Sequence, residues 1–345
     1  MEVIMNEKKF RVCLVGCGVI SENHLTALSA LPAVTVVALC DKYRSRAEAA
    51  AKTYAPGAAI YTDYEAMLDA ERPDAVHICT PHFLHAPMTC AALRRGINVF
   101  LEKPMATSVR EIEEIREAER ASRGRVCVCF QNRFNNTTLT AKAIADEDGG
   151  AITACGTVFW YRSDAYYAHS EWRGRMETEG GGVLINQAIH TLDMLSQFLG
   201  RPEYVQADIA NRRHRGIIDV EDTANGIIDF PGGRQGQFFA TTTFPGGDLT
   251  EVTIKTKNHC MVLTTSRLTL DGEVLTDATT EHYIGKPCYG AGHTVLIEKF
   301  YTALKNGDAL PVGTGDSAWA LELLKAAYAS RGEKIPVQHA KGDEA

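Results

Sequence analysis

The first 130 residues alternate short apolar runs with segments in which apolar side chains recur at helical spacing. The runs are largely apolar throughout, which is typical of strands in a sheet that is covered on both faces, and therefore of parallel βα units. We predict a doubly wound α/β domain in this part of the chain. Its predicted strands span residues 10–15, 34–40, 58–62, 75–80, 97–102 and 126–130.

The pattern changes after about residue 135, where runs alternate partly between apolar and polar residues. The turn signals "PGGR" at 231–234 and "PGGD" at 245–248 separate these runs, which favours antiparallel strands. Helical spacing recurs at 183–199, about 293–306 and about 316–330. We therefore predict an α/β domain at 1–132 and a second α/β domain at 133–345, whose sheet is mostly antiparallel. No low-complexity linker separates them, so we expect a cleft between packed domains.

Length and charge narrow the possible functions. A chain of 345 residues is longer than one core usually supports, which agrees with two domains. A formal net charge of −7 argues against nucleic acid and anionic membranes as partners, because both attract clustered Lys and Arg. The chain starts without the apolar run of a signal peptide and contains no stretch of roughly 18 apolar residues. We expect a cytoplasmic protein that acts on small molecules.

The cysteines mostly lie inside apolar runs, so we expect reduced thiols in the core. No C-x-x-C pair occurs, and the histidines do not join cysteines at zinc-like spacing, so we predict no metal. The ten cysteines are Cys13, Cys17, Cys40, Cys79, Cys90, Cys127, Cys129, Cys155, Cys260 and Cys288.

A glycine-rich turn follows the first predicted strand. In "VGCGVIS", Gly16 permits a tight turn, Gly18 lets a pyrophosphate approach the backbone, and Ser21 keeps the next helix close to the sheet. A glycine turn between a strand and a helix is common on its own. The order of strand, turn, helix and a later acid is what predicts dinucleotide binding.

That acid is Asp41, at the end of the second predicted strand. A carboxylate there accepts hydrogen bonds from the adenosine ribose and repels a 2′-phosphate, which favours NAD over NADP. Lys42, Arg44 and Arg46 follow, and any of them is able to accept a phosphate. NADP therefore stays open, although these three cations also fit a solvated helix start.

Lys103 follows the fifth predicted strand in "FLEKPMA". Ligands of open parallel sheets bind beyond the carboxyl ends of the strands, so Lys103 is expected where a nicotinamide would lie. With a pKa lowered by burial, it would exchange a proton with a hydroxyl group. The alternative is a surface lysine paired with Glu102.

The stretch 179–200, "EGGGVLINQAIHTLDMLSQFLG", predicts a mostly buried helix with a narrow polar stripe. Buried polar groups need polar partners, so the stripe is a candidate site. Asp193 is expected to bind the backbone or a neighbouring arginine, and no role is assigned to Gln197. The stripe comprises Asn186, His190, Asp193 and Gln197.

Five stretches together resemble the Gfo/Idh/MocA oxidoreductases: "GCGVIS", Asp41, "TPHFLH", "EKP" and "GGGVLINQAIHTLD". The resemblance covers nearly the whole chain. It implies an N-terminal Rossmann domain, a C-terminal α/β domain with a large open sheet, and redox chemistry on sugars or polyols with NAD or NADP. It also implies a homodimer or homotetramer.

The resemblance implies the cofactor site residue by residue. The pyrophosphate would contact the glycine turn, and the ribose would contact Asp41. The loop after the fourth strand would lie beneath the cofactor, and Glu102 and Lys103 would lie at the nicotinamide. The implied cofactor residues are Gly16, Gly18, Val19, Ile20, Asp41, Thr80, Pro81, His85, Glu102 and Lys103.

Lys103 matches the catalytic lysine of the family, and His190 matches the histidine that contacts the reacting hydroxyl. Arg133 matches an arginine near cofactor or substrate in some members. Trp172 and Arg173 would line the substrate pocket. They belong to the stretch 160–175, which is rich in Tyr, Trp and Arg and suits either sugar binding or an interface.

Asn186 departs from the family pattern, because many members carry aspartate there. Asparagine forms hydrogen bonds but carries no charge at neutral pH, so His190 should be protonated less readily. We expect Asn186 to orient substrate or imidazole. We also expect Lys103 to take a larger part in transferring the hydroxyl proton.

The sequence favours an NAD-dependent oxidoreductase that oxidises a secondary alcohol of a sugar, polyol or sugar derivative. Lys103 and His190 would handle the hydroxyl proton, and which of them is the base stays open. One alternative is a redox-neutral epimerase, lyase or glycosidase with retained NAD. Another is a non-catalytic dinucleotide sensor, which leaves Lys103 and His190 unexplained.

Overall fold

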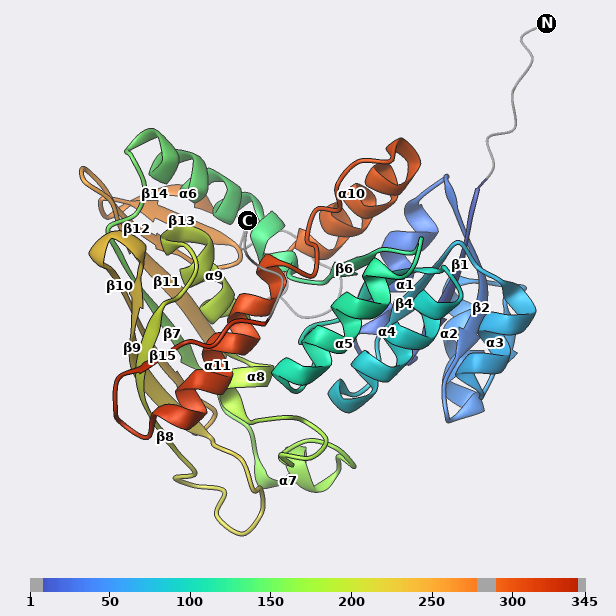
Figure 1. Ribbon diagram of the computed structural model, residues 1–345, viewed down its shortest axis with the longest axis horizontal. Coiled ribbons are helices and arrows are strands. Elements are labelled where there is room, and N and C mark those ends of the chain that lie inside the picture. Colours follow the sequence, from blue (N-terminus) through green and yellow to red (C-terminus); the bar gives the residue numbers. More distant parts are fainter. Residues whose placement is uncertain (1–8, 278–289, 341–345) are drawn as a thin grey trace, which may run out of the picture.

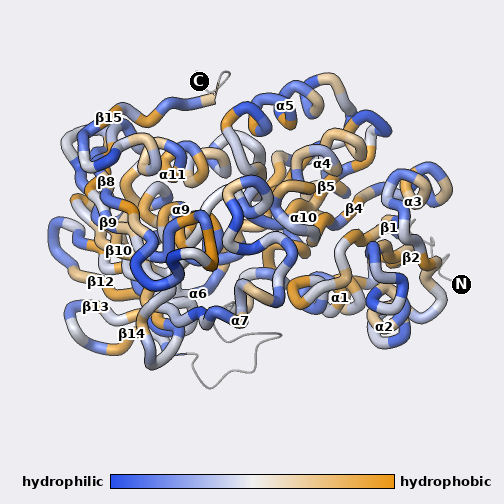
Figure 2. Tube along the Cα trace, turned by 90° about the horizontal axis from the view of Figure 1, so that it is seen from below, coloured by the Kyte–Doolittle hydropathy of each residue, from blue (hydrophilic) through white to orange (hydrophobic). Residues whose placement is uncertain are grey.

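The computed structural model describes residues 9–277 and 290–340. In its N-terminal part, six parallel strands form one sheet in the order β3-β2-β1-β4-β5-β6, as predicted (Figure 1). Apolar colour follows the buried strands, such as β5, in Figure 2. The strands are β1 (Phe10–Val15), β2 (Val34–Cys40), β3 (Ala59–Tyr61), β4 (Ala75–Ile78), β5 (Asn98–Leu101) and β6 (Val126–Val128).

The last three strands end one or two residues earlier than their apolar runs. The residues beyond β4 and β5 leave the sheet to form loops at its carboxyl edge, and these loops carry Thr80, Glu102 and Lys103. The helices between the strands are α1 (Ser21–Ala30), α2 (Arg44–Tyr54), α3 (Tyr64–Glu71), α4 (His85–Arg94) and α5 (Val109–Arg120). Ser108 and Glu111 cap the start of α5 reciprocally, which fixes where this helix begins.

The second sheet has nine strands in the order β14-β13-β12-β11-β7-β10-β9-β8-β15. It is mostly antiparallel, as predicted; β7 and β10 form its parallel pair. The strands are β7 (Thr153–Phe159), β8 (Tyr204–Ala210), β9 (Thr223–Phe230), β10 (Arg234–Thr241), β11 (Leu249–Lys255), β12 (Cys260–Leu263), β13 (Arg267–Leu270), β14 (Glu273–Asp277) and β15 (Ile335–Pro336).

Burial alternates along these strands, because helices cover one face of the sheet. Figure 1 shows α9 (Ile189–Leu199) and α11 (Trp319–Ser330) on the face nearer the N-terminal domain. The opposite face carries exposed apolar side chains, including Tyr204, Ile227 and Phe239. Two further helices, α6 (Asn136–Glu147) and the short α7 (Asp164–Ala168), lie at the ends of β7.

The predicted helix 183–199 is wrong in one respect, because the structure breaks it in two. Residues Val183–Asn186 form α8, and α9 begins only at Ile189. At the break, the N–H of Ala188 bonds back to the carbonyl of Val183 instead of that of Leu184, at 2.8 Å. The Glu221 carboxylate accepts the N–H groups of Gly182 and Leu184, which fixes α8 separately. Asn186 and His190 therefore do not share one continuous helical stripe.

The helix α10 (Gly292–Asn306) returns to the first domain and packs against α1 (Figure 1). Its Tyr301 lies 5.4 Å from Phe10, ring centre to ring centre. The predicted helix at 316–330 begins as a 3-10 turn, η5 (Asp316–Ala318), before α11. Within the described ranges, no helix is both long and apolar enough to cross a membrane.

Candidate active site

The glycine turn leaves room for a phosphate group. Gly16 has φ +91°, and a Cβ there would lie 2.5 Å from the carbonyl oxygen of Cys79, so only glycine fits. Above Gly18 no atom lies within 4 Å of such a Cβ position, and Val19 is 74% exposed. The Ser21 hydroxyl donates to the Gly18 carbonyl at 2.6 Å, and Ile20 precedes the first residue of α1. An anion therefore meets open backbone at a helix start.

Asp41 lies beside this turn, buried and held by backbone. Its Oδ2 accepts the N–H of Cys17 at 2.9 Å, and its Oδ1 accepts the N–H of Tyr43 at 2.8 Å. This fixes the carboxylate where a ribose diol would bind.

The three cations after Asp41 all have partners. Lys42 pairs with Glu171, Arg44 donates to Glu48 at 2.8 Å, and the Arg46 guanidinium lies 4.5 Å from the centre of the Tyr43 ring. None of them is reserved for a 2′-phosphate, so the geometry fits NAD better than NADP.

His85 braces the loops that follow β4 and β5. Its Nδ1 lies 2.6 Å from the Pro104 carbonyl and its Nε2 lies 2.9 Å from the Thr80 carbonyl. Burial lowers the pKa of this imidazole. The Thr80 hydroxyl is buried with no partner among the described residues, which leaves it for a ligand, and Pro81 starts the 3-10 turn η1 (His82–Leu84).

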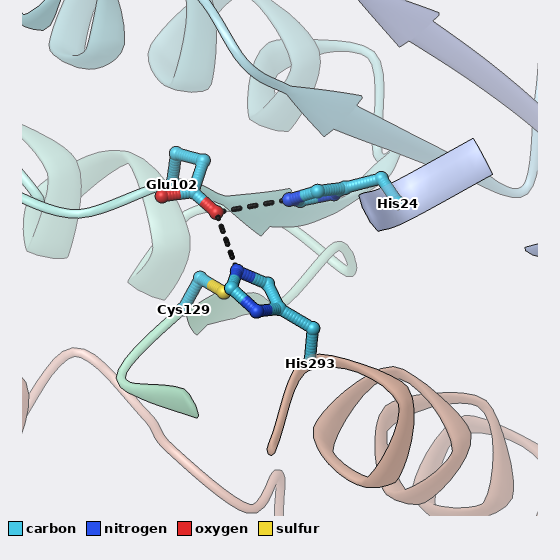
Figure 3. Close-up of side chains that lie close together, drawn as sticks. All are labelled: His24, Glu102, Cys129 and His293. Carbon is cyan, nitrogen blue, oxygen red and sulfur yellow. Dashed lines mark hydrogen bonds and ion pairs between the residues drawn. The ribbon is translucent and has the colours of Figure 1, made fainter. Parts of the chain in front are cut away.

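Glu102 is buried and held by two histidines (Figure 3). Its Oε1 lies 2.9 Å from Nε2 of His24 and 3.6 Å from Nε2 of His293. Burial alone would raise the pKa of Glu102, but these two histidines hold it well below the usual range. The pairing of Glu102 with Lys103, the alternative drawn from the sequence, does not form: the Lys103 Nζ donates to the backbone carbonyl of Asn186 at 3.0 Å.

Sequence reasoning missed the residues around Glu102, because they are far apart in the chain. Nδ1 of His24 lies 2.9 Å from Nδ1 of His77, whose Nε2 lies 2.9 Å from the Tyr301 hydroxyl. No spacing rule joins positions 24, 77 and 301.

His24, Glu102, Cys129 and His293 bring their nitrogen, oxygen and sulfur atoms within 4.8 Å of one another (Figure 3). Metal ions use the same donors, but Oε1 of Glu102 already accepts a hydrogen bond from His24, and His293 lies 3.6 Å from the same oxygen. The expectation of no metal rested on sequence spacing and stays a prediction. The nine described cysteines are free thiols; Cys288 lies outside the described residues.

Lys103, just beyond β5, and His190, in α9, come near enough for the charge of the lysine to act on the imidazole. Burial lowers the pKa of Lys103, and the carboxylates of Glu102 and Glu179 oppose that shift. Burial also lowers the pKa of His190 well below its usual range, and the charge of Lys103 adds to this effect. Nε2 of His190 lies 3.3 Å from the Gln131 amide nitrogen, and its Nδ1 has no partner among the described residues. A neutral imidazole therefore offers one unpaired nitrogen to a ligand.

The side chain of Asn186 points to a carboxylate rather than to the imidazole. Its Nδ2 donates to Oε1 of Glu179 at 2.5 Å. Glu179 is a further site residue that the sequence did not reveal, although it immediately precedes the three glycines.

Arg133 lies in a buried ion cluster. It donates to Asp193 at 2.9 and 2.6 Å and to Asp316 at 2.5 Å. The expectation that Asp193 binds a neighbouring arginine is confirmed. Both carboxylates occupy the guanidinium, which anchors η2 (Gln131–Phe134) to α9; a contact of Arg133 with cofactor or substrate stays a prediction.

Trp172 and Arg173 lie beside the loop after β4. The Trp172 ring centre is 4.7 Å from that of His82. The Arg173 guanidinium lies 4.9 Å from the Tyr166 ring centre and 4.7 Å from that of Trp172. The Arg173 guanidinium thus lies against two aromatic rings, and its charge also lowers the pKa of Lys103.

Comparison with known proteins agrees with this geometry. Residues 10–130 match the oxidoreductase family with an NAD-binding Rossmann fold, and residues 138–265 match the GFO/IDH/MocA C-terminal domain. The chain belongs to the Gfo/Idh/MocA family of oxidoreductases, and NAD is its cofactor.

Three relatives illustrate the likeness. D-glucoside 3-dehydrogenase of Escherichia coli (strain K12) is 27% identical over 68% of this chain and 70% of its own length. D-apiose dehydrogenase of Paraburkholderia graminis is 29% identical over 66% of this chain and 59% of its own length. The WlbA dehydrogenase from Bordetella pertussis, solved with NADH and UDP-GlcNAcA, is 27% identical over 96% of this chain and 99% of that one, with a TM-score of 0.83.

Proposed function

We propose that this protein oxidises a secondary alcohol of a sugar, polyol or sugar derivative. NAD, when bound, accepts the hydride from the alcohol carbon. The observation that carries the proposal is that Lys103, just beyond β5, bonds to the Asn186 carbonyl shortly before α9, while His190 in α9 keeps a buried nitrogen without a partner among the described residues. The motif residues before them fit the cofactor, since Gly16, Gly18 and Asp41 leave backbone and a carboxylate open to it.

Lys103 takes up the hydroxyl proton in this proposal. Its lowered pKa makes the neutral amine available nearer to neutral pH, and the Asn186 carbonyl fixes its direction. His190 stays neutral and holds the reacting hydroxyl through Nδ1. Asn186 bonds to Glu179 through its side chain and to Lys103 through its carbonyl, so in this proposal it orients the lysine rather than the imidazole, and a contact of Asn186 with substrate stays a prediction.

A sugar-like substrate is supported by the surroundings of His190 and by the relatives. Next to His190, the side-chain amide oxygen of Asn132 and the hydroxyl oxygen of Thr191 are buried without partners among the described residues, so they suit substrate hydroxyls. Trp172 and Arg173 add an aromatic face and a cation. The named relatives act on a glucoside and on apiose.

Assembly and location form part of the same proposal. The exposed apolar face of the nine-stranded sheet, with Ile227, Phe239 and Leu249, fits a homodimer or homotetramer interface. The free thiols of the described cysteines suit the reducing cytoplasm.

The test is a screen of sugars, sugar acids, polyols and glycosides with NAD and with NADP, followed by Lys103→Ala and His190→Ala on the best substrate. Both variants should bind NAD as the parent does and transfer hydride far more slowly. Lys142→Ala and His259→Ala remove an exposed lysine and a half-exposed histidine and serve as controls. Normal turnover in both site variants would refute the assignment.

The same screen separates the redox-neutral alternative. Cofactor that survives dialysis, with substrate converted and no net NADH, would replace dehydrogenation by epimerisation, elimination or hydrolysis. Binding of NAD with no substrate turned over would favour a sensor.

A further inference from the structure

Glu179 is a buried carboxyl group close to the catalytic lysine, and neither the family resemblance nor the proposed mechanism uses it. Its side chain is 1% exposed. Oε2 accepts the N–H of Gly174 at 2.5 Å, and Oε1 accepts the side-chain amide of Asn186 at 2.5 Å. Its own carbonyl lies 2.9 Å from Nδ1 of His82. All three oxygens of Glu179 therefore contact residues around the candidate active site.

Asn186 links this carboxyl to Lys103 by two different groups. The amide side chain donates to Glu179, while the backbone carbonyl accepts the Lys103 Nζ at 3.0 Å. Asn186 itself carries no charge, so it transmits position but supplies no countercharge. The Glu179 carboxyl group lies one hydrogen bond behind Asn186, whereas Glu102, next to Lys103 in the chain, has the larger charge effect on the amine.

The electrostatics agree with the geometry. Burial raises the pKa of Glu179 to about 7, against the hydrogen bonds from Gly174 and Asn186 that lower it. The Glu179 carboxylate in turn raises the pKa of Lys103 against the lowering by burial. Titratable and charged groups face Glu179 from each neighbouring element: Lys103 after β5, His82 in η1, Tyr166 and Tyr167 in α7, Arg173 in the following loop, Glu221 before β9 and Tyr328 in α11.

We propose that Glu179 is a positioning residue for the reaction, which holds Lys103 through Asn186 and adds a second negative charge, beside that of Glu102, that raises the proton affinity of the lysine amine. The inference rests on the proposed dehydrogenase function, because it assigns Lys103 the hydroxyl proton.

A purely structural Glu179 would only tie the Gly174 loop to α8. Its loss would then lower activity or stability without changing the ionisation of Lys103. The two roles therefore differ in the pH dependence of the reaction, not in whether a variant is impaired.

The first experiment compares pH profiles of kcat/KM for alcohol oxidation in the parent, Glu179→Gln, Glu179→Asp and Glu177→Gln. Because Glu179→Gln removes a negative charge near Lys103, the acidic limb should move to lower pH by about half a unit or more. Glu179→Asp keeps the charge and should stay near the parent profile, with a lower kcat. Glu177→Gln removes an exposed charge two residues away and should change nothing. An unmoved limb in Glu179→Gln, or the same shift in Glu179→Asp, overturns the proposal.

The second experiment needs neither turnover nor a variant of Glu179. Lysines of the parent are reductively methylated with ¹³C-formaldehyde, and the Lys103 signal is assigned by its absence in Lys103→Arg. Its titration should show an inflection near pH 7, from Glu179, below the inflection of the amine itself. A single inflection overturns the proposal even if the Gln variant does not fold. If the screen finds no substrate but the inflection near pH 7 is present, the proposed function fails while the Glu179–Lys103 coupling stands.

Discussion

Two buried glutamates flank Lys103 and ionise in opposite ways. Two histidines hold the pKa of Glu102 well below its usual range, whereas burial raises the pKa of Glu179 to about 7, where its hydrogen bonds come from one N–H and one amide. Both are almost inaccessible to solvent. The difference teaches that partners, rather than depth, decide whether a buried acid is charged at neutral pH. One glutamate is a fixed charge next to the lysine, and the other is able to change with pH.

The largest expected effect removes the group that both glutamates act on. Lys103→Ala should lower the rate of hydride transfer by about 10²–10⁴-fold, because the hydroxyl proton then has no positioned acceptor. Single-turnover NADH formation measures the rate, and NAD titration by fluorescence checks binding. Weakened NAD binding that accounts for the whole loss would contradict the assignment.

The next effect tests the fixed charge. Glu102→Gln should lower the free energy of unfolding by about 1.5–3 kcal/mol at pH 7, because the buried His24 loses its hydrogen bond to a carboxylate. Urea unfolding measures it. Since the folded-state pKa of Glu102 is depressed, its contribution is present above the unfolded-state pKa and lost as the pH falls through the folded-state pKa. Equal stability of parent and variant at pH 7 would show that the two histidines do not depend on the charge.

Glu179 should show the opposite pH dependence. Its pKa rises from 4.5 to about 7 on folding, so the folded state binds the proton more tightly. Its contribution is present below pH 4.5 and lost as the pH rises to about 7, a change of about 3 kcal/mol relative to Glu179→Gln. Urea unfolding of both proteins at pH 5 and pH 8 gives the difference. If the difference in unfolding free energy between the two proteins were the same at pH 5 and pH 8, the pKa of Glu179 would not be raised by folding.

Asp41 extends the comparison to an acid that backbone N–H groups hold. Asp41→Ala should weaken NAD binding about tenfold and leave NADP binding almost unchanged, because the lost acceptors serve the ribose diol that only NAD carries. Dissociation constants of both cofactors measure it, and Asp63→Ala, at the exposed cap of α3, is the control. A parallel loss for both cofactors would mean that Asp41 supports the turn rather than the ribose.

Local patterns were enough to predict much of the fold. Apolar runs identified the strands of the first sheet. Gly16 and Asp41 could be placed because each follows a strand end directly, and Lys103 because it lies two residues beyond one. Partial alternation and glycine turns indicated the second sheet. In each case the information lies within one element and its neighbour along the chain.

The rest of the site depends on contacts between distant segments. His24 and His293 meet at Glu102 although they belong to α1 and α10, and no periodicity connects them. The start of α8 is held by Glu221, which lies far along the chain and accepts the N–H groups of Gly182 and Leu184. Helical spacing alone therefore placed Asn186 on the stripe of His190, whereas its amide faces Glu179.

The return of α10 to the first domain has a consequence for protein engineering. Tyr301 and His293 of this helix complete a polar network inside the N-terminal sheet, with His77, His24 and Glu102. In a chimera that exchanged only residues 1–132 for those of a relative, the relative's residues at positions 24, 77 and 102 would have to pack against an α10 from this chain. The unit that can be transplanted intact is thus discontinuous in the chain, and a graft of the nucleotide domain should carry residues 292–306 with it.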